Sequence, residues 1–318
     1  SVNGFCPICT DETGEPYTVP AHTKEWFMQQ AGGIFKTKDD HITENIDNLS
    51  YETDLRAFGY FGETWAYDNC TVESLEIDGK NVKIKLVEPS YYGIKANMEF
   101  YLYNALCEID MPGEYYLDRD NAKLYYYPKE DLAESKVSFV MQPNSMVVMN
   151  GVKNVQWQNI SFTNGNSCGI EVLDCEYVEI AGCKFDNFGL QAVNLRGYNN
   201  TIRSCDISNM GSGGVIIHGG DVYNLTRGNN NVINCDFKNF SIVNRTNAPA
   251  IYLYDCGNNA IRNRIYDAPN NGIYYHGPYT LIYGNEMFDL CYEASDNGAI
   301  YCGRSWYDVR GSVIQNNY

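Results

Sequence analysis

The sequence has no apolar run approaching the roughly 18 residues that a membrane-spanning helix needs, so we expect no membrane insertion. Basic residues are also scarce: 23 Lys and Arg stand against 40 Asp and Glu, a net charge of -17. A nucleic-acid-binding protein needs a basic face, and this charge balance excludes nucleic acid as a partner. The same balance argues weakly against polyanionic substrates.

The 3.6-residue apolar period of long helices is missing as well. Hydrophobic residues make up 44% of the 318 positions, which is typical of a globular chain. They occur in short segments separated by turn residues, and this pattern predicts an all-β protein. No secretory signal peptide is visible after Ser1.

Tyrosine and cysteine are abundant, with 27 and 12 residues respectively. Tyrosine rings fit a carbohydrate-facing surface, where they stack on sugars, and they equally suit half-buried strands. Cys6-Pro-Ile-Cys9 is a lone CxxC without a second pair or a histidine cluster nearby, so we expect no metal site there.

The chain divides into three regions. Residues 1–50 show no clear pattern, and we interpret them as an N-terminal segment that is either a linker or a remnant of the main fold. Residues 51–136 contain short alternating strands such as Val82–Leu86, with turn pairs such as Asp78-Gly79 between them. This alternation predicts a small antiparallel β-sandwich or barrel.

Residues 137–318 contain an internal repeat built on segments such as NISF, GCKF, SCDI and NCDF. The apolar anchors of successive repeats are Phe162, Phe185, Ile207, Phe237, Ile265, Met287 and Tyr318. Their spacings are 23, 22, 30, 28, 22 and 31 residues. A minimum near 22 with insertions predicts a parallel β-helix, in which each coil is one repeat.

Each coil has three short strands, and stacking of the coils aligns equivalent residues. The inward row of the first strand is predicted to be Ile170, Val193, Val215, Ile251, Ile273 and Ile300. The second strand is marked by Ile180, Ile202, Val232, Ile261 and Ile282. Two positions before the anchors, a buried ladder is predicted at Cys183, Cys205, Cys235, Asn263, Asn285 and Asn316, with reduced cysteines.

The sequence ends at Tyr318, in the middle of a coil. A β-helix normally protects its ends with caps. We therefore expect further coils or caps beyond both ends of this sequence.

The outward positions of the first strands gather the residues that can bind a substrate. Three stacked tyrosines are predicted on one face, and histidine, tyrosine and arginine side chains lie beside them. The predicted substrate-binding residues are Tyr252, Tyr254, Tyr274, Tyr301, His218, His276, Asp221, Arg196 and Arg304.

Carboxylates flank the same strands. Cleavage of a glycosidic bond needs one carboxyl group to protonate the leaving oxygen and a second to attack or to activate water. Asp255 follows one first strand, and Asp296 precedes another two coils further on. Glu293 is a reserve candidate for the proton donor. Asp255 and Asp296 also fit turn positions, where they would only accept backbone N–H bonds.

Several motifs resemble those of a known family. They are Glu108-Ile-Asp-Met-Pro-Gly-Glu-Tyr-Tyr-Leu-Asp118, Leu124-Tyr-Tyr-Tyr-Pro128, Gly219-Gly-Asp221, Pro249-Ala-Ile251, His276-Gly277 and Cys291-Tyr-Glu-Ala-Ser-Asp-Asn-Gly-Ala-Ile-Tyr-Cys-Gly-Arg304. The sequence resembles right-handed parallel β-helix proteins of the pectate-lyase-like superfamily. Within them it is similar to glycoside hydrolase family 141, which includes fucosidase and xylanase activities.

The resemblance implies a β-helix interrupted by a small β-domain, here residues 51–136. It also implies that the aspartate of the Asp-x-Gly-Ala motif, Asp296, is a catalytic carboxylate. The expected function is hydrolysis of a plant or host polysaccharide or oligosaccharide by a secreted, periplasmic or cell-surface protein that needs no cofactor.

Two other functions fit the same residues. A polysaccharide lyase would need a base, and either Ca²⁺ or a cation such as Arg196 or Arg304 to neutralise a uronate. A non-catalytic carbohydrate-binding protein would use the β-helix as a rigid stalk.

Overall fold

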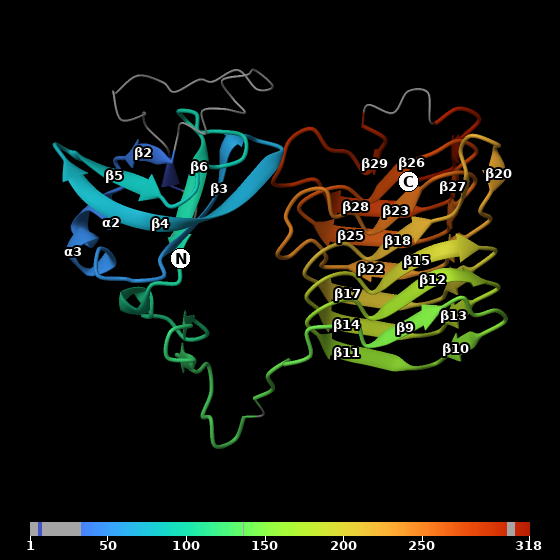
Figure 1. The fold of residues 1–318 in the computed structure, drawn as a ribbon, viewed down its shortest axis with the longest axis horizontal. Coiled ribbons are helices and arrows are strands. Elements are labelled where there is room, and N and C mark those ends of the chain that lie inside the picture. The colour runs from blue at the N-terminus through green and yellow to red at the C-terminus, as the bar shows by residue number, and fades with distance from the viewer. Residues whose placement is uncertain (1–5, 8–32, 136, 304–308) are drawn as a thin grey trace. The chain divides into compact units, whose positions relative to one another are not determined.

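The computed structural model describes residues 6–7, 33–135, 137–303 and 309–318. The chain forms two compact units, Ser1–Ser138 and Phe139–Tyr318 (Figure 1). Nearly all regular structure is β-strand: the second unit is a parallel β-helix, and the first carries an antiparallel sheet. The predicted fold class is therefore confirmed.

The first unit is built on a six-stranded sheet in the order β1-β6-β3-β4-β5-β2, with antiparallel pairing throughout. Its strands are β1 (Cys6–Pro7), β2 (Ile34–Thr37), β3 (Arg56–Glu63), β4 (Ala66–Asp78), β5 (Asn81–Leu86) and β6 (Glu99–Tyr103). The smaller elements are α2 (Asp40–Glu44), α3 (Ile46–Leu49), the 3-10 turn η1 (Leu106–Glu108) and the hairpin β7 (Tyr115–Asp118) with β8 (Lys123–Tyr126).

Residues 33–50 belong to this small unit and do not form a separate segment, which corrects the boundary predicted at residue 50. Strand β2 pairs with β5, so that Phe35 lies opposite Ile84. Phe35 is fully buried, and Ile42 and Leu49 pack into the same core. The sequence did not show this because β2 has only four residues and the two helices are too short for an apolar period.

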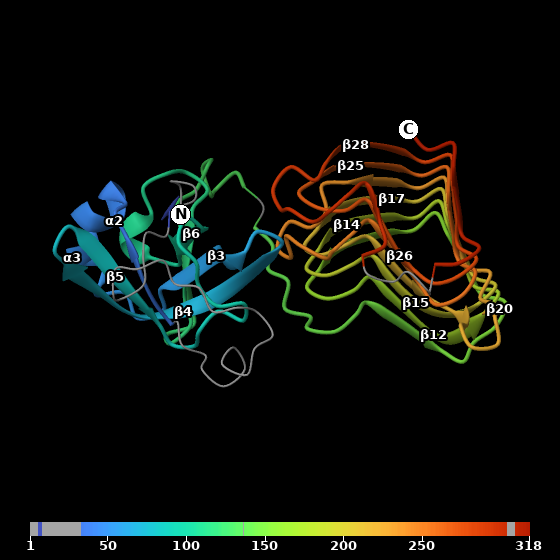
Figure 2. The same cartoon turned by 90° about the horizontal axis from the view of Figure 1, so that it is seen from above.

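The second unit contains three parallel sheets, and each coil contributes one strand to each sheet (Figure 2). The first sheet contains β9 (Val147–Asn150), β12 (Ile170–Glu176), β15 (Val193–Tyr198), β18 (Val215–His218), β23 (Ile251–Tyr254), β26 (Ile273–His276) and β29 (Ile300–Tyr301). The second contains β10 (Gln156–Gln158), β13 (Glu179–Ala181), β16 (Thr201–Arg203), β21 (Asn231–Ile233), β24 (Asn259–Ile261), β27 (Leu281–Tyr283) and β30 (Val313–Gln315).

The third sheet contains β11 (Ser161–Gly165), β14 (Lys184–Phe188), β17 (Asp206–Met210), β22 (Asp236–Lys238), β25 (Arg264–Ala268) and β28 (Glu286–Leu290). A small hairpin, β19 (Gly220–Asp221) with β20 (Thr226–Arg227), projects after β18. Its eight residues account for much of the longer spacing between the anchors of that coil.

The register confirms the predicted repeat. Phe162, Phe185, Ile207, Phe237, Ile265 and Met287 lie opposite one another in successive coils. The predicted inward row of the first strands is also aligned from Ile170 to Ile300. These rows fill one continuous apolar core along the helix.

Three positions of the repeat differ from the prediction by one residue. Tyr318, predicted as the last anchor, is 82% exposed. Its N–H donates to the Asn285 carbonyl as the Glu286 N–H donates to the Asn263 carbonyl, so Tyr318 aligns with Glu286 and not with the anchor Met287. In β24 the buried residue aligned with Val232 and Ile282 is Ala260, and Ile261 lies half-exposed. The buried asparagine ladder ends at Asn317, whose Oδ1 accepts from the Asn285 amide, and Asn316 takes a left-handed turn position with a φ of 56°.

Buried asparagines satisfy the backbone groups that the corners of the coils leave unpaired. The Nδ2 of Asn230 donates to the Gly197 carbonyl and to the Asn258 Oδ1, at 2.8 and 2.9 Å. Its Oδ1 accepts from the backbone and the side chain of Asn200, both at 3.0 Å. The ladder cysteines Cys183, Cys205 and Cys235 are buried and free, as predicted.

Among the described residues, the longest helix has five residues, and no helix could cross a membrane. Within the same ranges, no group of three His, Cys, Asp or Glu side chains is arranged to hold a metal ion. Cys9 of the CxxC pair lies outside the described residues.

The row of buried asparagines Asn200, Asn230 and Asn258, here called the Asn230 ladder, yields a stability prediction. We expect Asn230→Ala to lower the free energy of unfolding by about 2–4 kcal/mol, because buried amide and carbonyl groups of two neighbouring coils lose their partner. Urea unfolding followed by circular dichroism measures the change. The matched deletion of an exposed amide, Gln156→Ala, should stay within about 0.5 kcal/mol; equal unfolding midpoints for both variants would contradict the role of the ladder.

Candidate active site

Three tyrosines lie side by side on the outer face of the first sheet. Tyr252 is aligned with Tyr274, and Tyr274 with Tyr301. Their ring centroids are 4.5 and 5.3 Å apart, and the rings are tilted by 51° and 58°. The alternation of the strands puts all three on one surface because their neighbours Ile251, Ile273 and Ile300 point into the core.

A second row runs beside the tyrosines and contains Arg196, His218, Tyr254 and His276. The His218 and Tyr254 rings are stacked at 4.2 Å with an angle of 7°, and Tyr254 stacks on Tyr252 at 3.9 Å. Because these rings face one another, they present edges and polar atoms to solvent more than open ring faces. The surface is therefore a hydrogen-bonding surface rather than a flat aromatic floor.

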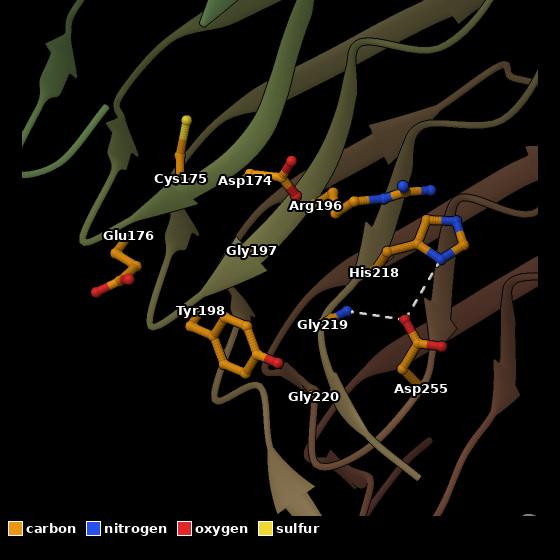
Figure 3. A pocket seen from close by; sticks show the side chains of 10 residues that line it. All are labelled: Asp174, Cys175, Glu176, Arg196, Gly197, Tyr198, His218, Gly219, Gly220 and Asp255. Carbon is orange, nitrogen blue, oxygen red and sulfur yellow. Dashed lines mark hydrogen bonds and ion pairs between the residues drawn. The ribbon is translucent and has the colours of Figure 1, made fainter. Parts of the chain in front are cut away.

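Asp255 lies directly after β23 with a left-handed φ of 63°. Its Oδ2 accepts from the Gly219 N–H at 3.1 Å and lies 3.5 Å from the Nδ1 of His218 (Figure 3). The next coil passes very close: a Cβ at Gly277 would lie 1.4 Å from the Asp255 carbonyl oxygen. Only glycine fits at position 277, directly after His276. The close packing of this glycine against the backbone of Asp255 restricts the position of Asp255.

A cleft of about 550 Å³ opens at the carboxyl ends of the first-sheet strands. Figure 3 shows His218 facing Asp255, with the Arg196 side chain extending toward His218. The lining residues are Asp174, Cys175, Glu176, Arg196, Gly197, Tyr198, His218, Gly219, Gly220 and Asp255. The structure thus brings together three of the predicted site residues.

Asp174, Glu176 and Tyr198 were not singled out from the sequence. Asp174 and Glu176 lie in the C-terminal part of β12, and Tyr198 is the last residue of β15. Their place at the carboxyl ends of first-sheet strands, near that of Asp255, was the signal that could have identified them. Glu176 is ion-paired with Lys153 at 2.9 Å.

Asp296 lies at the other end of the tyrosine row. It is exposed, has a φ of 49°, and its Oδ1 accepts a hydrogen bond of 2.9 Å from the Tyr301 hydroxyl. Burial and this contact raise the pKa of Tyr301 to about 12. Burial likewise raises the pKa of Tyr274 and Tyr252. All three hydroxyls therefore stay protonated at neutral pH and can donate hydrogen bonds.

The remaining predicted residues have other contacts. Both oxygens of Glu293 accept from the Nε of Arg245 at 3.1 Å. Asp221 caps the β19–β20 turn, where Oδ1 accepts from the backbone of Tyr223 and Asn224 at 2.8 and 3.0 Å. Arg304 lies outside the described residues.

Asp296 is not among the residues that line the cleft at Asp255, and five side chains lie between the two carboxylates. Ring contacts and hydrogen bonds connect Asp296 to Asp255 through Tyr301, Tyr274, Tyr252, Tyr254 and His218 in that order. The row therefore places hydroxyl and imidazole groups between two carboxylates.

Comparison with known proteins agrees with this geometry. The model of the right handed beta helix region matches residues 145–314. The chain belongs to the right-handed β-helix proteins. The model of the GH141 insertion domain matches residues 57–129 of this β-helix protein, within its small antiparallel unit. The resemblance to glycoside hydrolase family 141 is therefore confirmed.

Among solved structures, the β-helix protein is similar to one titled "Glycoside hydrolase". The TM-score is 0.67 at 14% sequence identity, over 98% of this chain and 73% of the other. At this identity the likeness shows the fold. A search of curated proteins found no match. The match to the GH141 insertion domain supports a relationship to glycoside hydrolases.

The turn at Asp221 yields a pH prediction. Hydrogen bonds from the backbone and side chain of Asn224 lower the pKa of Asp221. Because the folded-state pKa is depressed, the stabilisation is present above about pH 4 and is lost as the pH falls through the lowered pKa.

We expect Asp221→Ala to lower the melting temperature at pH 7 and to matter less toward pH 3. Asp221→Asn, which keeps an acceptor oxygen but does not titrate, should lower the melting temperature at pH 7 less than Asp221→Ala does. Its difference from wild type should change with pH by the same amount as that of Asp221→Ala, because both variants lack the titrating carboxyl group. If Asp221→Ala lowers the melting temperature by the same amount at every pH, Asp221 does not stabilise the fold through its lowered pKa.

Proposed function

We propose that the protein is a glycoside hydrolase acting on a plant or host polysaccharide or oligosaccharide, with Asp255 and Asp296 as its carboxylate pair. The row of tyrosine and histidine side chains that runs between the two carboxylates is the observation that supports this proposal. The matches to the GH141 insertion domain and to a glycoside hydrolase structure support the reaction class.

The two carboxylates are assigned different roles from their neighbours. Asp255 lies beside His218, an imidazole that can exchange protons with it, and is assigned as the proton donor to the leaving oxygen. Asp296, bonded to the Tyr301 hydroxyl, is assigned as the group that attacks the anomeric carbon or activates water. This chemistry needs no cofactor.

The aromatic surface is assigned to binding. Hydroxyls of Tyr252 and Tyr274 can donate to sugar oxygens, because their raised pKa values keep them protonated near neutral pH. Tyr301, whose hydroxyl proton is donated to Asp296, can accept from a sugar hydroxyl, and Tyr254 lies in the same row. His276 and Arg196 extend the same row. An enzyme that acts on polysaccharides works outside the cytoplasm, and we therefore propose that the protein is exported.

A lyase is the second candidate, because His218, Asp255 and Arg196 lie in one cleft. In that reaction His218 would remove the proton beside a uronate, and Arg196 would neutralise its carboxylate. Lyases leave an unsaturated sugar that absorbs ultraviolet light. Reducing ends released from a uronate-containing glycan without this absorbance would exclude the lyase.

The carboxylate pair is tested by substitution. We expect Asp296→Asn and Asp255→Asn each to lower kcat by about 10²–10⁴-fold, with unchanged folding. Nitrophenyl fucosides and xylo-oligosaccharides are suitable first substrates, because the resembled family includes these activities.

Asp289→Asn is the matched control for Asp296→Asn, since Asp289 is also exposed and has a φ of 51°. The control should retain wild-type kcat. Full activity in Asp296→Asn would eliminate Asp296 as a catalytic residue.

The Tyr301 hydrogen bond is tested separately. Tyr301→Phe removes only the hydroxyl that bonds Asp296, and we expect kcat to fall about tenfold, the usual value of one hydrogen bond to a charged group. Tyr103→Phe, which removes a hydroxyl bonded to Asn69 at 2.7 Å in the small unit, is the control. Equal rates for both variants would argue against a role for Tyr301.

A further inference from the structure

The segment that carries Asp296 is fixed at both ends. Residues 291–298, here called the Asp296 loop, connect β28 with β29. The Gly298 N–H donates to the Oδ1 of the buried Asn271 at 2.9 Å, and the Glu293 N–H donates to the Pro269 carbonyl at 3.3 Å. Only the tip of the loop, Ser295 and Asp296, is exposed between these two points.

One side-chain contact ties this loop to another. The Nε of Arg245 lies 3.1 Å from each carboxylate oxygen of Glu293, and the second guanidinium nitrogen also contacts Oε2. The Arg245 and Glu293 side chains are only 22% and 18% exposed. A planar guanidinium that grips both oxygens fixes the direction of the carboxylate as well as its distance.

Arg245 itself projects from a firmly held segment. Residues 240–249, here called the Arg245 loop, connect β22 with β23 and lie against an earlier coil. The N–H groups of Ser241, Val243 and Asn244 donate to the carbonyls of Ser212 and Gly211 at 2.7–2.8 Å. Ser241 is fully buried. The guanidinium is therefore attached to the rigid body of the helix.

We propose that Arg245 and Glu293 form a clamp that positions Asp296 for catalysis, an inference that rests on the proposed function. The Arg245 loop leads into β23 and the Asp296 loop into β29, with β26 between these strands. The contact thus connects loops that are two coils apart. It holds the Asp296 loop at Glu293, three residues before Asp296. Glu293 is a positioning residue in this assignment, and its two oxygens are already occupied by Arg245.

The clamp matters because a misplaced carboxylate catalyses poorly. Displacement of a reacting group by about 1 Å can cost roughly 10²-fold in rate. Release of the loop should therefore lower kcat about 10- to 100-fold and change KM little, since the tyrosine row does not depend on this contact.

The test uses Glu293→Gln, Arg245→Met and the double variant in the full chain. Each single change breaks the same tie, so we expect the double variant to lose no more activity than either single variant. Glu286→Gln, which breaks the exposed Arg264–Glu286 pair at 3.4 Å on the third sheet, is the control. If Glu293 were instead the proton donor, Glu293→Gln would lose the alkaline limb of the pH–rate profile and Arg245→Met would keep it, and this result would overturn the clamp.

A second measurement is independent of turnover. Amide hydrogen exchange should become faster in residues 291–298 in both single variants and stay unchanged in the coils of residues 147–239. Unchanged exchange in the Asp296 loop would overturn the clamp even if Asp296→Asn is inactive. If exchange becomes faster in the single variants but the wild-type protein cleaves no glycan, the contact does fix the loop, and it is the proposed hydrolase function that is wrong.

Discussion

Every coil of the helix must turn sharply at the corners, and this requirement shapes the whole second unit. Residues in the left-handed region form three ladders along the helix, two at the bends between strands and one near the ends of the third-sheet strands. The ladders are Asn154, Tyr177, Asn199, Asn229, Gly257, Tyr279 and Gly311; Asn159, Gly182, Ser204, Asn234, Arg262, Gly284 and Asn316; and Asn164, Asn187, Asn209, Asn239, Asp267 and Asp289. Other side chains lose roughly 1–2 kcal/mol in this conformation, and Asn, Asp and Gly avoid most of that cost. The corners therefore explain why the helix is rich in asparagine.

The same geometry explains where chemistry can enter the repeat. Corners fixed in register keep the strands parallel, so an outward side chain in one coil lies beside its equivalent in the next. Tyrosine at three successive outward positions then forms a surface instead of isolated rings. Asp255 and Asp296 are themselves left-handed turn residues, with φ values of 63° and 49°. A turn role and a catalytic role are thus compatible, because the constrained backbone holds each carboxylate in one place.

The sequence predicted most of the residues that recur in every coil, and it missed contacts made by the insertions between coils. The inward row and the anchors were identifiable because β-branched and aromatic residues recur with the coil. Ala260 was missed because the larger Ile261 beside it carries the stronger apolar signal. The Arg245–Glu293 pair could not be predicted, since both residues lie in insertions that follow no period and are 48 positions apart.

The ring geometry also changes what the tyrosines can contribute. Abundant tyrosine on a predicted carbohydrate surface suggests flat rings beneath a sugar. In the structure His218 stacks on Tyr254, and Tyr254 stacks on Tyr252 of the same strand, so these ring faces contact one another. In the proposed site, the ring edges and hydroxyls would act as directional hydrogen-bonding groups that distinguish sugars by the orientation of their hydroxyl groups. Because one row both packs between the coils and carries the proposed binding groups, removing a whole ring would disturb folding and binding together, and only deletion of a hydroxyl separates the two effects.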